Sequence, residues 1–353
     1  MNNDIPLISI VLTTYNSEKI IKETLKAVVN QDFPLNTVEL IIVDGGSKDN
    51  TLNIIKEFIN NYVKYFYDMK LITHEKNYGV SKARNDGIKQ AKGRFILILD
   101  HDVIMPKGTL STLLHYIESS NRKVVAVIPL HNNTCKGIIN TWEYVIRKGK
   151  IWKTNTITSC ALARRELFNK IGLYDESLGP PYTIYEDIEL GARTLSKGYE
   201  IHLLGTTEVI HDTCDGSSEI EISKKSKTSF LTLFHKGVEI IKRILNVRYI
   251  YALRKYVNSA PISEKMRWYS YSALLVLLIP AIICYVFGII ILPLIWGIVT
   301  IALYFDVIHQ YWNSKVPFIS LIYALTAYLW RLIRSYALLV SLISFNKLKI
   351  KYA

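Results

Sequence analysis

Cysteine is scarce in this sequence, and two patterns that mark common site types are missing. Four cysteines occur among 353 residues, at positions 135, 160, 214 and 284, and no two of them share CxxC spacing. Cysteines this few and this far apart indicate neither a zinc site nor a disulfide framework. The first apolar strand is followed by TTYNSE rather than by GxGxxG, which argues against a dinucleotide-binding Rossmann domain.

Acidic residues are scarce after position 218. Residues 1–218 contain 26 Lys and Arg against 25 Asp and Glu, whereas residues 219–353 contain 17 against 5. The basic tail borders an uncharged apolar run from Trp268 to Phe305. This context favours an anionic membrane face as the partner of the tail and argues against nucleic acid. As a helix this run would extend roughly 57 Å, nearly twice a ~30 Å hydrocarbon core. We therefore expect a transmembrane hairpin over residues 268–308, turning near Gly288 and Pro293.

A further apolar stretch, Phe318 to Phe345, is interrupted by Arg331 and Arg334. Arginine near a bilayer centre costs about 2.5 to 3.5 kcal/mol on insertion scales, so residues 309–353 are expected to form an interfacial helix or a third membrane helix with a basic C-terminus. Residues 216–267 alternate apolar and basic positions, as in an amphipathic connector.

The opening MNNDIPLISIV enters a strand pattern without a basic region or a small-residue cleavage site. Such a start does not resemble a signal peptide. We therefore expect a multi-pass protein of the cell membrane whose N-terminal domain, residues 1–215, stays in the cytoplasm.

Strand and helix patterns alternate through the first hundred residues. Short apolar strands are predicted at 8–12, 40–43, 69–73 and 95–99, and two of the intervening helices are expected to be capped by Ser17 and Asp49. Strands separated by helices pair in parallel through right-handed crossovers. Ligands of such sheets bind beyond the carboxyl ends of the strands, where Asp44 and Asp100 stand.

Two carboxylates leave the fourth predicted strand together, because ILILDHDVIMP places Asp100 and Asp102 one residue apart. A single Asp after a strand is usually a helix cap or an Asx turn. Two like charges in one space repel unless a cation lies between them, and hard oxygen ligands favour Mg²⁺ or Mn²⁺ over zinc. The pair therefore predicts a divalent cation with open positions for phosphate oxygens.

Three segments together closely resemble family 2 glycosyltransferases of the GT-A fold: ISIVLTTYNSEKIIKETLKAVVNQ, IIVDGGSKDNT and NYGVSKARNDGIKQAKGRFILILDHD. The resemblance covers residues 7–211. It implies an α/β nucleotide-diphospho-sugar transferase fold, in which a Rossmann-like mixed sheet is flanked by helices. Residues 1–102 would be the nucleotide-binding half and residues 103–215 the acceptor-binding half.

The resemblance implies nucleotide contacts for four residues. Thr13 and Tyr15 would border the base, Asp44 would accept a hydrogen bond from it, and Arg84 would help to hold the nucleotide. Structural roles are open for three of them: Tyr15 as a core aromatic, Asp44 as a turn residue, and Arg84 as a surface ion pair.

For the metal shell, the resemblance implies Asp100, which would also approach the ribose, and Asp102, which would ligate a cation bridging the diphosphate. His211, after a later predicted strand, would complete the shell, because neutral imidazole is a permissible Mn²⁺ ligand. A loop or surface histidine explains His211 equally well. The expected cofactor is Mg²⁺ or Mn²⁺.

An acidic pair, Glu186 and Asp187, lies in SLGPPYTIYEDIELGARTLSKGYEI at the predicted start of a helix. Displacing a nucleotide diphosphate by an alcohol needs a base for the hydroxyl proton. The resemblance implies Asp187 as this base, with Glu186 orienting it or binding an acceptor hydroxyl. Acids at a helix N-terminus are also favoured by the helix dipole alone. Arg193, on the same helix, would assist the diphosphate or form a helix-face ion pair.

These features predict an inverting, hexosyltransferase-type enzyme that moves a sugar from a nucleotide diphosphate sugar to a hydroxyl of a lipid-linked or membrane-surface glycan. The donor is expected to be UDP-linked, because a carboxylate such as Asp44 suits the ring N–H of uracil. A polyprenyl phosphate acceptor is already an anion and needs no base. Two alternatives stay open: a polyprenyl-phosphate sugar synthase, and an inactive sugar-nucleotide-binding membrane scaffold.

Overall fold

The computed structural model describes residues 5–134, 144–145, 147–178, 185–212, 256–263, 265–266 and 268–269. The chain divides into two units, one of Met1–Gly137 with Arg147–Glu221 and the other of Ile138–Ile146 with Ile222–Ala353. In the second unit, described residues form short helical turns, and the Tyr256 and Trp268 rings meet edge-on at 6.3 Å. The strands and helices discussed below all belong to the first unit.

The membrane predictions fall on the second unit. The part of the chain that the structure describes contains no helix long and apolar enough to cross a bilayer. Apart from residues 268 and 269, the predicted hairpin (268–308) and the predicted interfacial or third membrane helix (309–353) lie outside that part. Attachment to a membrane therefore stays a prediction.

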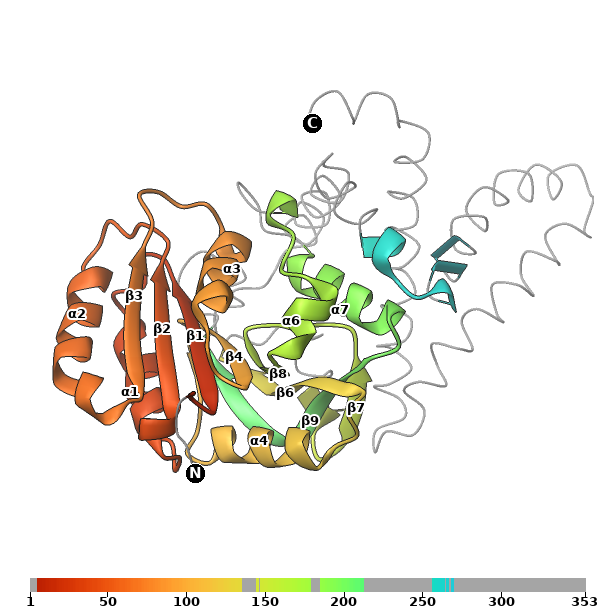
Figure 1. The fold of residues 1–353 in the computed structure, drawn as a ribbon, viewed down its shortest axis with the longest axis horizontal. Helices are drawn as coiled ribbons and strands as arrows, with labels where there is room; N and C mark the ends of the chain where they lie inside the picture. The colour runs from red at the N-terminus through yellow and green to blue at the C-terminus, as the bar shows by residue number, and fades with distance from the viewer. Residues whose placement is uncertain are drawn as a thin grey trace, which may run out of the picture. The chain divides into compact units, whose positions relative to one another are not determined.

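Nine strands of the first unit form one mixed sheet (Figure 1). Neighbouring strands follow the order β3-β2-β1-β4-β8-β6-β9-β5, and β7 pairs with β9. β1 to β4 are parallel to one another, whereas β8 is antiparallel to both β4 and β6. The strands are β1 Ile8–Thr14, β2 Val38–Asp44, β3 Asp68–Thr73, β4 Phe95–Asp100, β5 Val103–Ile104, β6 Val124–Asn133, β7 Ile151–Thr154, β8 Cys160–Arg164 and β9 Glu200–His211.

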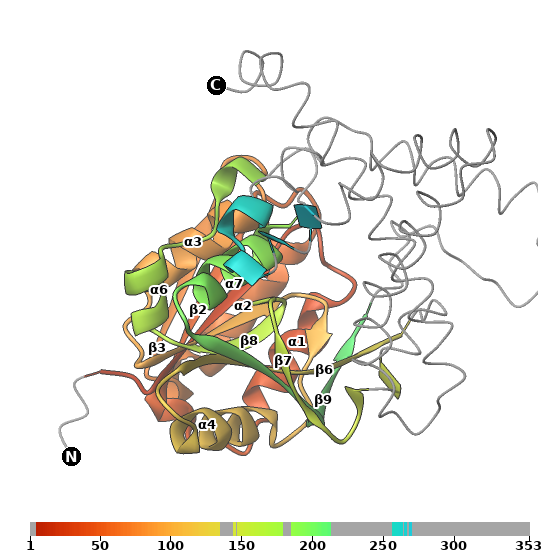
Figure 2. The same ribbon diagram turned by 90° about the vertical axis from the view of Figure 1, so that its right-hand side faces the viewer.

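Helices cover both faces of this sheet. Figures 1 and 2 show α3, α6 and α7 on one side and α4 on the other. The helices are α1 Ile21–Val29, α2 Thr51–Tyr62, α3 Val80–Gln90, α4 Thr109–Ser119, α6 Glu166–Ile171 and α7 Glu186–Ser196. Short 3₁₀ turns span Leu35–Thr37, Val63–Tyr65 and Glu176–Leu178. The predicted α/β fold, a mixed sheet flanked by helices, is therefore confirmed.

The central strand β1 is buried along its whole length. Ile10 and Leu12 share a core with Leu25 of α1 and Ile55 of α2. Because side chains alternate across a strand, Val11 points to the opposite face, where α3 packs. Burial on both faces explains why the parallel strands are continuous apolar runs rather than alternating ones.

The two predicted helix caps have different outcomes. Ser17 is not the cap of α1, because the helix begins at Ile21 after Ile20. The Ser17 carbonyl instead accepts the Ile20 and Ile21 amides in a preceding turn, and its hydroxyl bonds to the Thr14 hydroxyl. Asp49 accepts the amide of Thr51, the first residue of α2, at 3.1 Å, although the residue at the cap position is Asn50.

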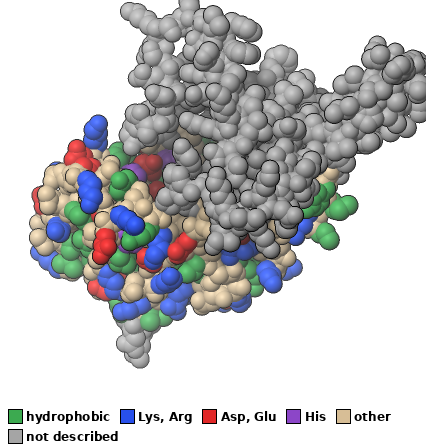
Figure 3. Space-filling model, turned by 90° about the horizontal axis from the view of Figure 1, so that it is seen from above, with side chains coloured by type: hydrophobic (Ala, Val, Ile, Leu, Met, Phe, Trp, Pro, Cys, Tyr) green, Lys and Arg blue, Asp and Glu red, His purple; other side chains and the backbone are tan. Residues whose placement is uncertain are grey.

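The surface of the first unit carries both signs of charge. On the face seen in Figure 3, Lys and Arg side chains are interspersed with Asp and Glu, in keeping with the near-neutral count for residues 1–218. Exposed pairs such as Lys26–Glu23 and Lys153–Glu200 contribute about 0–1 kcal/mol each. Buried charged groups at Glu39 and Arg84 matter more for the fold and for the site.

Glu39 is a fully buried carboxylate near the start of β2. It accepts hydrogen bonds from the Ser9 hydroxyl, from the Lys92 amide at 2.9 Å and from Lys70 Nζ at 2.7 Å. Burial alone raises the pKa of Glu39, but these hydrogen bonds outweigh it and hold the pKa below its usual value. The carboxylate thereby ties β1, β2, β3 and the turn before β4 together.

Glu39→Ala is expected to lower the free energy of unfolding by about 3–5 kcal/mol, because it leaves the Lys70 ammonium and the Lys92 amide without their buried partner. Denaturant unfolding followed by near-ultraviolet circular dichroism measures this loss. Glu57→Ala, at an exposed position of α2, is the control. Because the folded-state pKa of Glu39 is lowered, its contribution is present above the unfolded-state pKa and is lost as pH falls through the folded value. Equal stability of both variants would contradict this role.

Candidate active site

A cavity of about 280 Å³ opens at the carboxyl ends of the parallel strands. Its walls come from the segments that follow β1, β2, β3 and β4. The lining residues are Thr13, Thr14, Tyr15, Gly45, Asn77, Gly79, Val80, Ala83, Asp100, His101 and Asp102. The strand register explains the convergence, because Thr13 is paired with Asp100 and Thr14 with Asp44. The structure therefore has a cavity at the edge where the sequence predicts a ligand site.

Tyr15 borders the cavity and is 39% exposed, so it is not a core aromatic. The next residue, Asn16, has a φ of 47°. This uncommon conformation is held in place because the Asn16 amide donates to the Ser47 hydroxyl at 2.8 Å and its side chain accepts the Lys48 amide at 2.8 Å. The loops after β1 and β2 thus form one rigid wall that presents the Tyr15 ring.

Asp44 stands at the end of β2 but is fully buried and does not line the cavity. Its carboxylate accepts the Gly46 and Ser47 amides, each at 3.0 Å, and the Ser47 hydroxyl. These contacts agree with the structural alternative, in which Asp44 is a turn residue. A carboxylate has about four lone-pair positions, so a contact to a base requires the position that these three hydrogen bonds leave open.

Arg84 joins the two halves of the domain. It lies on α3, its side chain is 4% exposed, and Nη2 donates to Asp100 Oδ2 at 2.8 Å. Nη1 of the same guanidinium donates to Glu186 Oε1 at 3.2 Å, and Thr13 Oγ1 donates to Asp100 Oδ1 at 2.9 Å. The interpretation of Arg84 as a surface pair is wrong, because Arg84 is buried and pairs with Asp100 of β4 and Glu186 of α7.

The charges around Arg84 shift one another's ionisation. Burial lowers the pKa of Arg84, but Asp100, Tyr174 and Glu186 raise it by more than burial lowers it. The guanidinium therefore stays charged. Burial raises the pKa of Asp187 and of Glu186, the Asp187 charge raises that of Glu186 further, and Arg84 opposes both shifts only in part. Two carboxylates with raised pKa values therefore begin α7, which suits a base that must accept a proton.

Asp102 and His211 form a second pair beside this cluster. Asp102 Oδ2 lies 3.3 Å from His211 Nε2, and β5 places them together because Val103 is paired with His211. Burial lowers the pKa of His211, but the hydrogen bond to Asp102 raises it above its usual value. Behind them His131 is half-buried, and burial and the nearby His211 charge lower its pKa to about 3.

The donor set at Asp102 fits a divalent cation held together with a nucleotide diphosphate. Asp102 Oδ1 is buried and accepts no hydrogen bond from the described residues. Those residues contain no group of three or more His, Cys, Asp or Glu arranged to hold a metal alone. Mg²⁺ and related cations are commonly bound by one or two protein ligands plus substrate phosphates, and an open carboxylate oxygen beside an imidazole meets that requirement. Asp100, by contrast, is engaged by Arg84 and Thr13.

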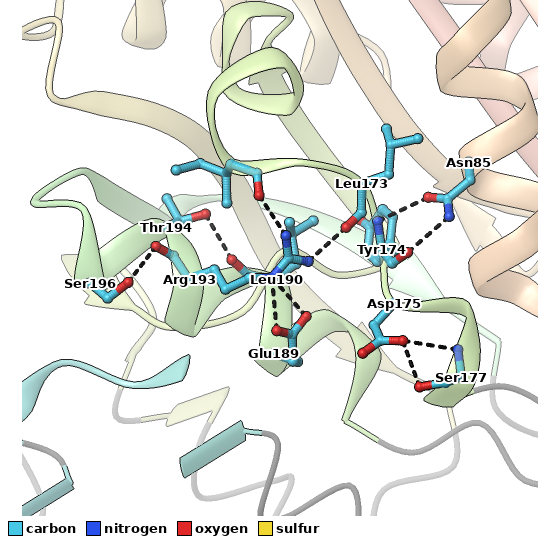
Figure 4. Close-up of polar contacts among 11 residues, drawn as sticks. Asn85, Leu173, Tyr174, Asp175, Ser177, Glu189, Leu190, Arg193, Thr194 and Ser196 are labelled. Atoms are coloured by element: carbon cyan, nitrogen blue, oxygen red, sulfur yellow. Dashed lines mark hydrogen bonds and ion pairs between the residues drawn. The ribbon is translucent and has the colours of Figure 1, made fainter. Parts of the chain in front are cut away.

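A layer of polar contacts fixes α7 behind these residues (Figure 4). Arg193 donates from Nε to Glu189 at 2.8 Å and from Nη1 and Nη2 to the carbonyls of Ile171 and Leu173. Of the two roles considered for Arg193, the structure shows the helix-face ion pair. Asn85 of α3 accepts the Tyr174 amide and donates to the Tyr174 carbonyl, each at 2.9 Å. The acidic pair is thereby held against α3.

Gly191 lets α7 approach the segment before β8. A Cβ at this position would lie 2.0 Å from the Asn155 carbonyl oxygen, which is backbone and cannot rotate away. Gly191→Ala is therefore expected to destabilise the domain by about 1–3 kcal/mol and to lower turnover by displacing Glu186 and Asp187. Thermal unfolding and turnover of nucleotide sugar measure both effects, with Lys197→Ala, at the exposed end of α7, as the control. Unchanged turnover in Gly191→Ala would contradict the positioning role of α7.

The cavity and the adjoining cluster include residues without a predicted role. Asn77, Gly79 and Val80 line the cavity from the segment after β3, and the strand-end rule applied to that strand would have found them. His131 had no comparable signal. Its place beside His211 depends on the pairing of β6 with β9, which the sequence does not reveal.

Part of the chain is similar in sequence to known glycosyltransferases. Residues 9–172 match the family described as Glycosyl transferase family 2. A poly(ribitol-phosphate) beta-N-acetylglucosaminyltransferase, TarS, of Staphylococcus aureus is 36% identical over 120 residues, which are 34% of this chain and 20% of that protein. A poly-beta-1,6-N-acetyl-D-glucosamine synthase of Staphylococcus epidermidis is 30% identical over 206 residues, 55% of this chain and 47% of that protein. The chain thus matches less than half of the length of either relative.

Among solved structures, a mannosyltransferase of Pyrobaculum calidifontis, PcManGT, in complex with GDP-Man and Mn²⁺, is similar with a TM-score of 0.53. The alignment covers 96% of this chain and 87% of that chain at 17% sequence identity, a level at which the likeness concerns the fold. The strand order and this likeness show a GT-A-like α/β fold, in which residues 9–172 match glycosyltransferase family 2.

Proposed function

We propose that the protein is a metal-dependent, inverting glycosyltransferase. It transfers a sugar from a nucleotide diphosphate sugar to a hydroxyl of a glycan at the membrane surface. One observation carries the proposal: a carboxylate with an unpartnered buried oxygen, Asp102, lines a cavity at the strand ends, and the Arg84–Asp100 pair links that cavity to Glu186 at the start of α7. The names of the similar proteins, a poly(ribitol-phosphate) beta-N-acetylglucosaminyltransferase and a poly-beta-1,6-N-acetyl-D-glucosamine synthase, support the same class of reaction.

Asp187 acts as the general base. Burial disfavours its charged form, so the carboxylate gains by taking the proton of an acceptor hydroxyl. The hydroxyl oxygen bonds to the anomeric carbon as the bond from that carbon to the diphosphate oxygen breaks, and the proton goes to Asp187. Attack opposite the leaving group inverts the anomeric centre. Glu186, held by Arg84, orients the acceptor.

Asp102 and His211 would hold the cation, and Asp100 would approach the ribose. When bound, the cation neutralises the charge of the diphosphate leaving group. The Arg84 guanidinium is paired with Asp100 and Glu186, so it couples the carboxylate at the donor side to the carboxylate at the acceptor side. Tyr15 and Thr13 border the base, and the open position of the Asp44 carboxylate receives its N–H.

The donor is proposed to be a UDP sugar, and a donor screen tests this. Purified protein is supplied with Mn²⁺ and with UDP or GDP sugars, and release of nucleoside diphosphate is measured with membrane extract as acceptor. We expect release from a UDP sugar, with UDP-N-acetylglucosamine included because of the relatives' names. Faster release from a GDP sugar would contradict the role of Asp44, and no release from any donor would favour the scaffold alternative.

The acceptor is proposed to be lipid-linked, and the catalytic domain is proposed to lie on the cytoplasmic side of the cell membrane. The predicted membrane segments and the need for a base together motivate this choice. A polyprenyl-phosphate sugar synthase is the competing function. It predicts a product that is labile to mild acid and soluble in organic solvent, formed with polyprenyl phosphate as the sole acceptor; the proposed function predicts no such product.

A further inference from the structure

A second cavity, of about 240 Å³, lies at the edge of the sheet opposite the strand ends that form the candidate active site. Phe95 begins β4 and Asp100 ends it, so the two regions are separated by about 17 Å along the strand. The residues lining this second cavity are Ile5, Arg94, Phe95, Arg122, Arg164, Arg165, Glu166 and Asn169. Four arginines from three separate segments thus surround one small space.

Arg164 is the buried member of this group, with 5% of its surface exposed. Its Nε donates to the Val124 carbonyl at 3.1 Å, its Nη2 donates to the Ile117 carbonyl, and its guanidinium lies 5.7 Å from the centre of the Phe95 ring. Among the described residues no carboxylate lies within ion-pair distance of it. The neutral carbonyls fix the position of this cation without compensating its charge.

Most of the surrounding charges are positive, and the one carboxylate among the described residues that line the cavity, Glu166, is paired with Lys170 at 3.6 Å. Arg122 and Arg165 are exposed and form no ion pair with the described residues. Arg94, 5.1 Å from the centre of the Phe95 ring, is paired with Glu118 at 3.3 Å. Burial and the charge of Arg122 lower the pKa of Arg164 below its usual value, which is the direction expected of a cation that lacks a counter-charge.

A structural role accounts for part of this arrangement. Ile117 lies in the last turn of α4, so the Arg164 guanidinium satisfies a carbonyl that the helix leaves open. That role needs one arginine. It does not explain why Arg94, Arg122 and Arg165 meet at the same cavity, because like charges brought together repel one another.

We propose that this arginine pocket, defined by Arg94, Arg122, Arg164 and Arg165, binds a phosphate group. Guanidinium groups present planar pairs of N–H donors that match phosphate oxygens, and the Asn169 amide offers a further donor. The phosphate belongs to a soluble phosphate compound or to a phospholipid headgroup, since both present the same oxygens. The pocket is separate from the proposed donor site and does not depend on the glycosyltransferase proposal.

Calorimetric titration of the purified full chain, in neutral detergent and without divalent cations, tests the proposal. One arm uses inorganic phosphate and the other uses dihexanoyl-phosphatidylglycerol below its micelle concentration, both at constant ionic strength. The test variant is Arg122→Glu with Arg165→Glu. The control, Lys56→Glu, reverses one exposed charge on α2. If the double glutamate variant fails to fold by circular dichroism, Arg122→Gln with Arg165→Gln replaces it.

Saturable binding in at least one arm is expected, weakened by about tenfold or more in the test variant and unchanged in Lys56→Glu. Tighter binding of inorganic phosphate would assign the pocket to soluble phosphate compounds, and tighter binding of the lipid would assign it to a headgroup. The proposal is overturned if neither compound binds saturably, or if the test variant binds both as well as the control does.

Discussion

Asp187→Asn is expected to lower kcat for sugar transfer by about 10²- to 10⁴-fold, the usual contribution of a general base, while binding of the donor is retained. Asparagine keeps the oxygen that accepts the Ile188 amide at 2.8 Å, so α7 still begins in the same way. Single-turnover transfer and nucleotide affinity, measured side by side, separate chemistry from binding. Asp68→Asn, whose side chain is 40% exposed at the start of β3, controls for the loss of one carboxylate.

The raised pKa of Asp187 gives this prediction a pH dependence. The base works in its ionised form, so kcat/KM should fall as pH drops through the raised value, and Asp187→Asn should lack that limb. Stability should change in the opposite direction. Because the folded-state pKa is raised, the group favours folding most below its unfolded-state pKa, and this contribution is lost as pH rises through the folded value. The variant should therefore be at least as stable as the parent at neutral pH. Full activity in Asp187→Asn would show that another group is the base.

Asp102→Asn is expected to lower turnover by about 100-fold or more, because the open oxygen beside His211 is the proposed cation ligand. A second measurement, independent of turnover, is the binding of Mn²⁺ in the presence of nucleoside diphosphate, monitored by electron paramagnetic resonance. Free Mn²⁺ should bind to the parent protein and stay in solution with the variant. Asp32→Asn removes an exposed carboxylate that is hydrogen-bonded only to Ser111 among the described contacts, and it should behave as the parent does.

Loss of Mn²⁺ binding without loss of turnover would contradict the role of Asp102, as would equal binding in both variants. His211→Ala serves as a further comparison. It removes the imidazole but leaves both carboxylate oxygens, so we expect an intermediate loss of affinity, about 10-fold. The alternative of a surface histidine predicts no loss.

The donor side of the site could be predicted because it follows from the topology. Parallel strands end at one edge, so Asp44 and Asp100 were expected at the ligand-binding edge, and Asp100 does line the cavity there. The local side-chain contacts could not be predicted from the topology. Whether Asp44 reaches the cavity depends on the turn at Gly46 and Ser47, whose two amides and one hydroxyl bond to its carboxylate and leave one position open.

The acceptor side could be predicted only through its resemblance to a family. Arg84 and Glu186 are 102 positions apart, and their ion pair forms in a sheet where the antiparallel strand β8 inserts between β4 and β6 and α7 packs against β9. Short-range patterns carry no information on that insertion. The same holds for His131, which reaches His211 through the parallel pairing of β6 and β9.

The arginine pocket could not be predicted from the sequence, for a different reason. Arg164 and Arg165 stand in ALARRELFNK, where basic residues before a helix look like ordinary surface charge. Only the folded structure brings Arg94 and Arg122 beside them, and only the burial of Arg164 distinguishes this cluster from a solvated basic face.

If a cation held at Asp102 makes the diphosphate a leaving group, sugar transfer depends on that cation. The most direct measurement is release of UDP from a UDP sugar by the purified chain, first with Mn²⁺, then with excess chelator, then with Mn²⁺ restored. We expect the rate to fall by at least about 100-fold in chelator and to recover fully when Mn²⁺ is restored. Equal rates with and without the chelator would contradict it.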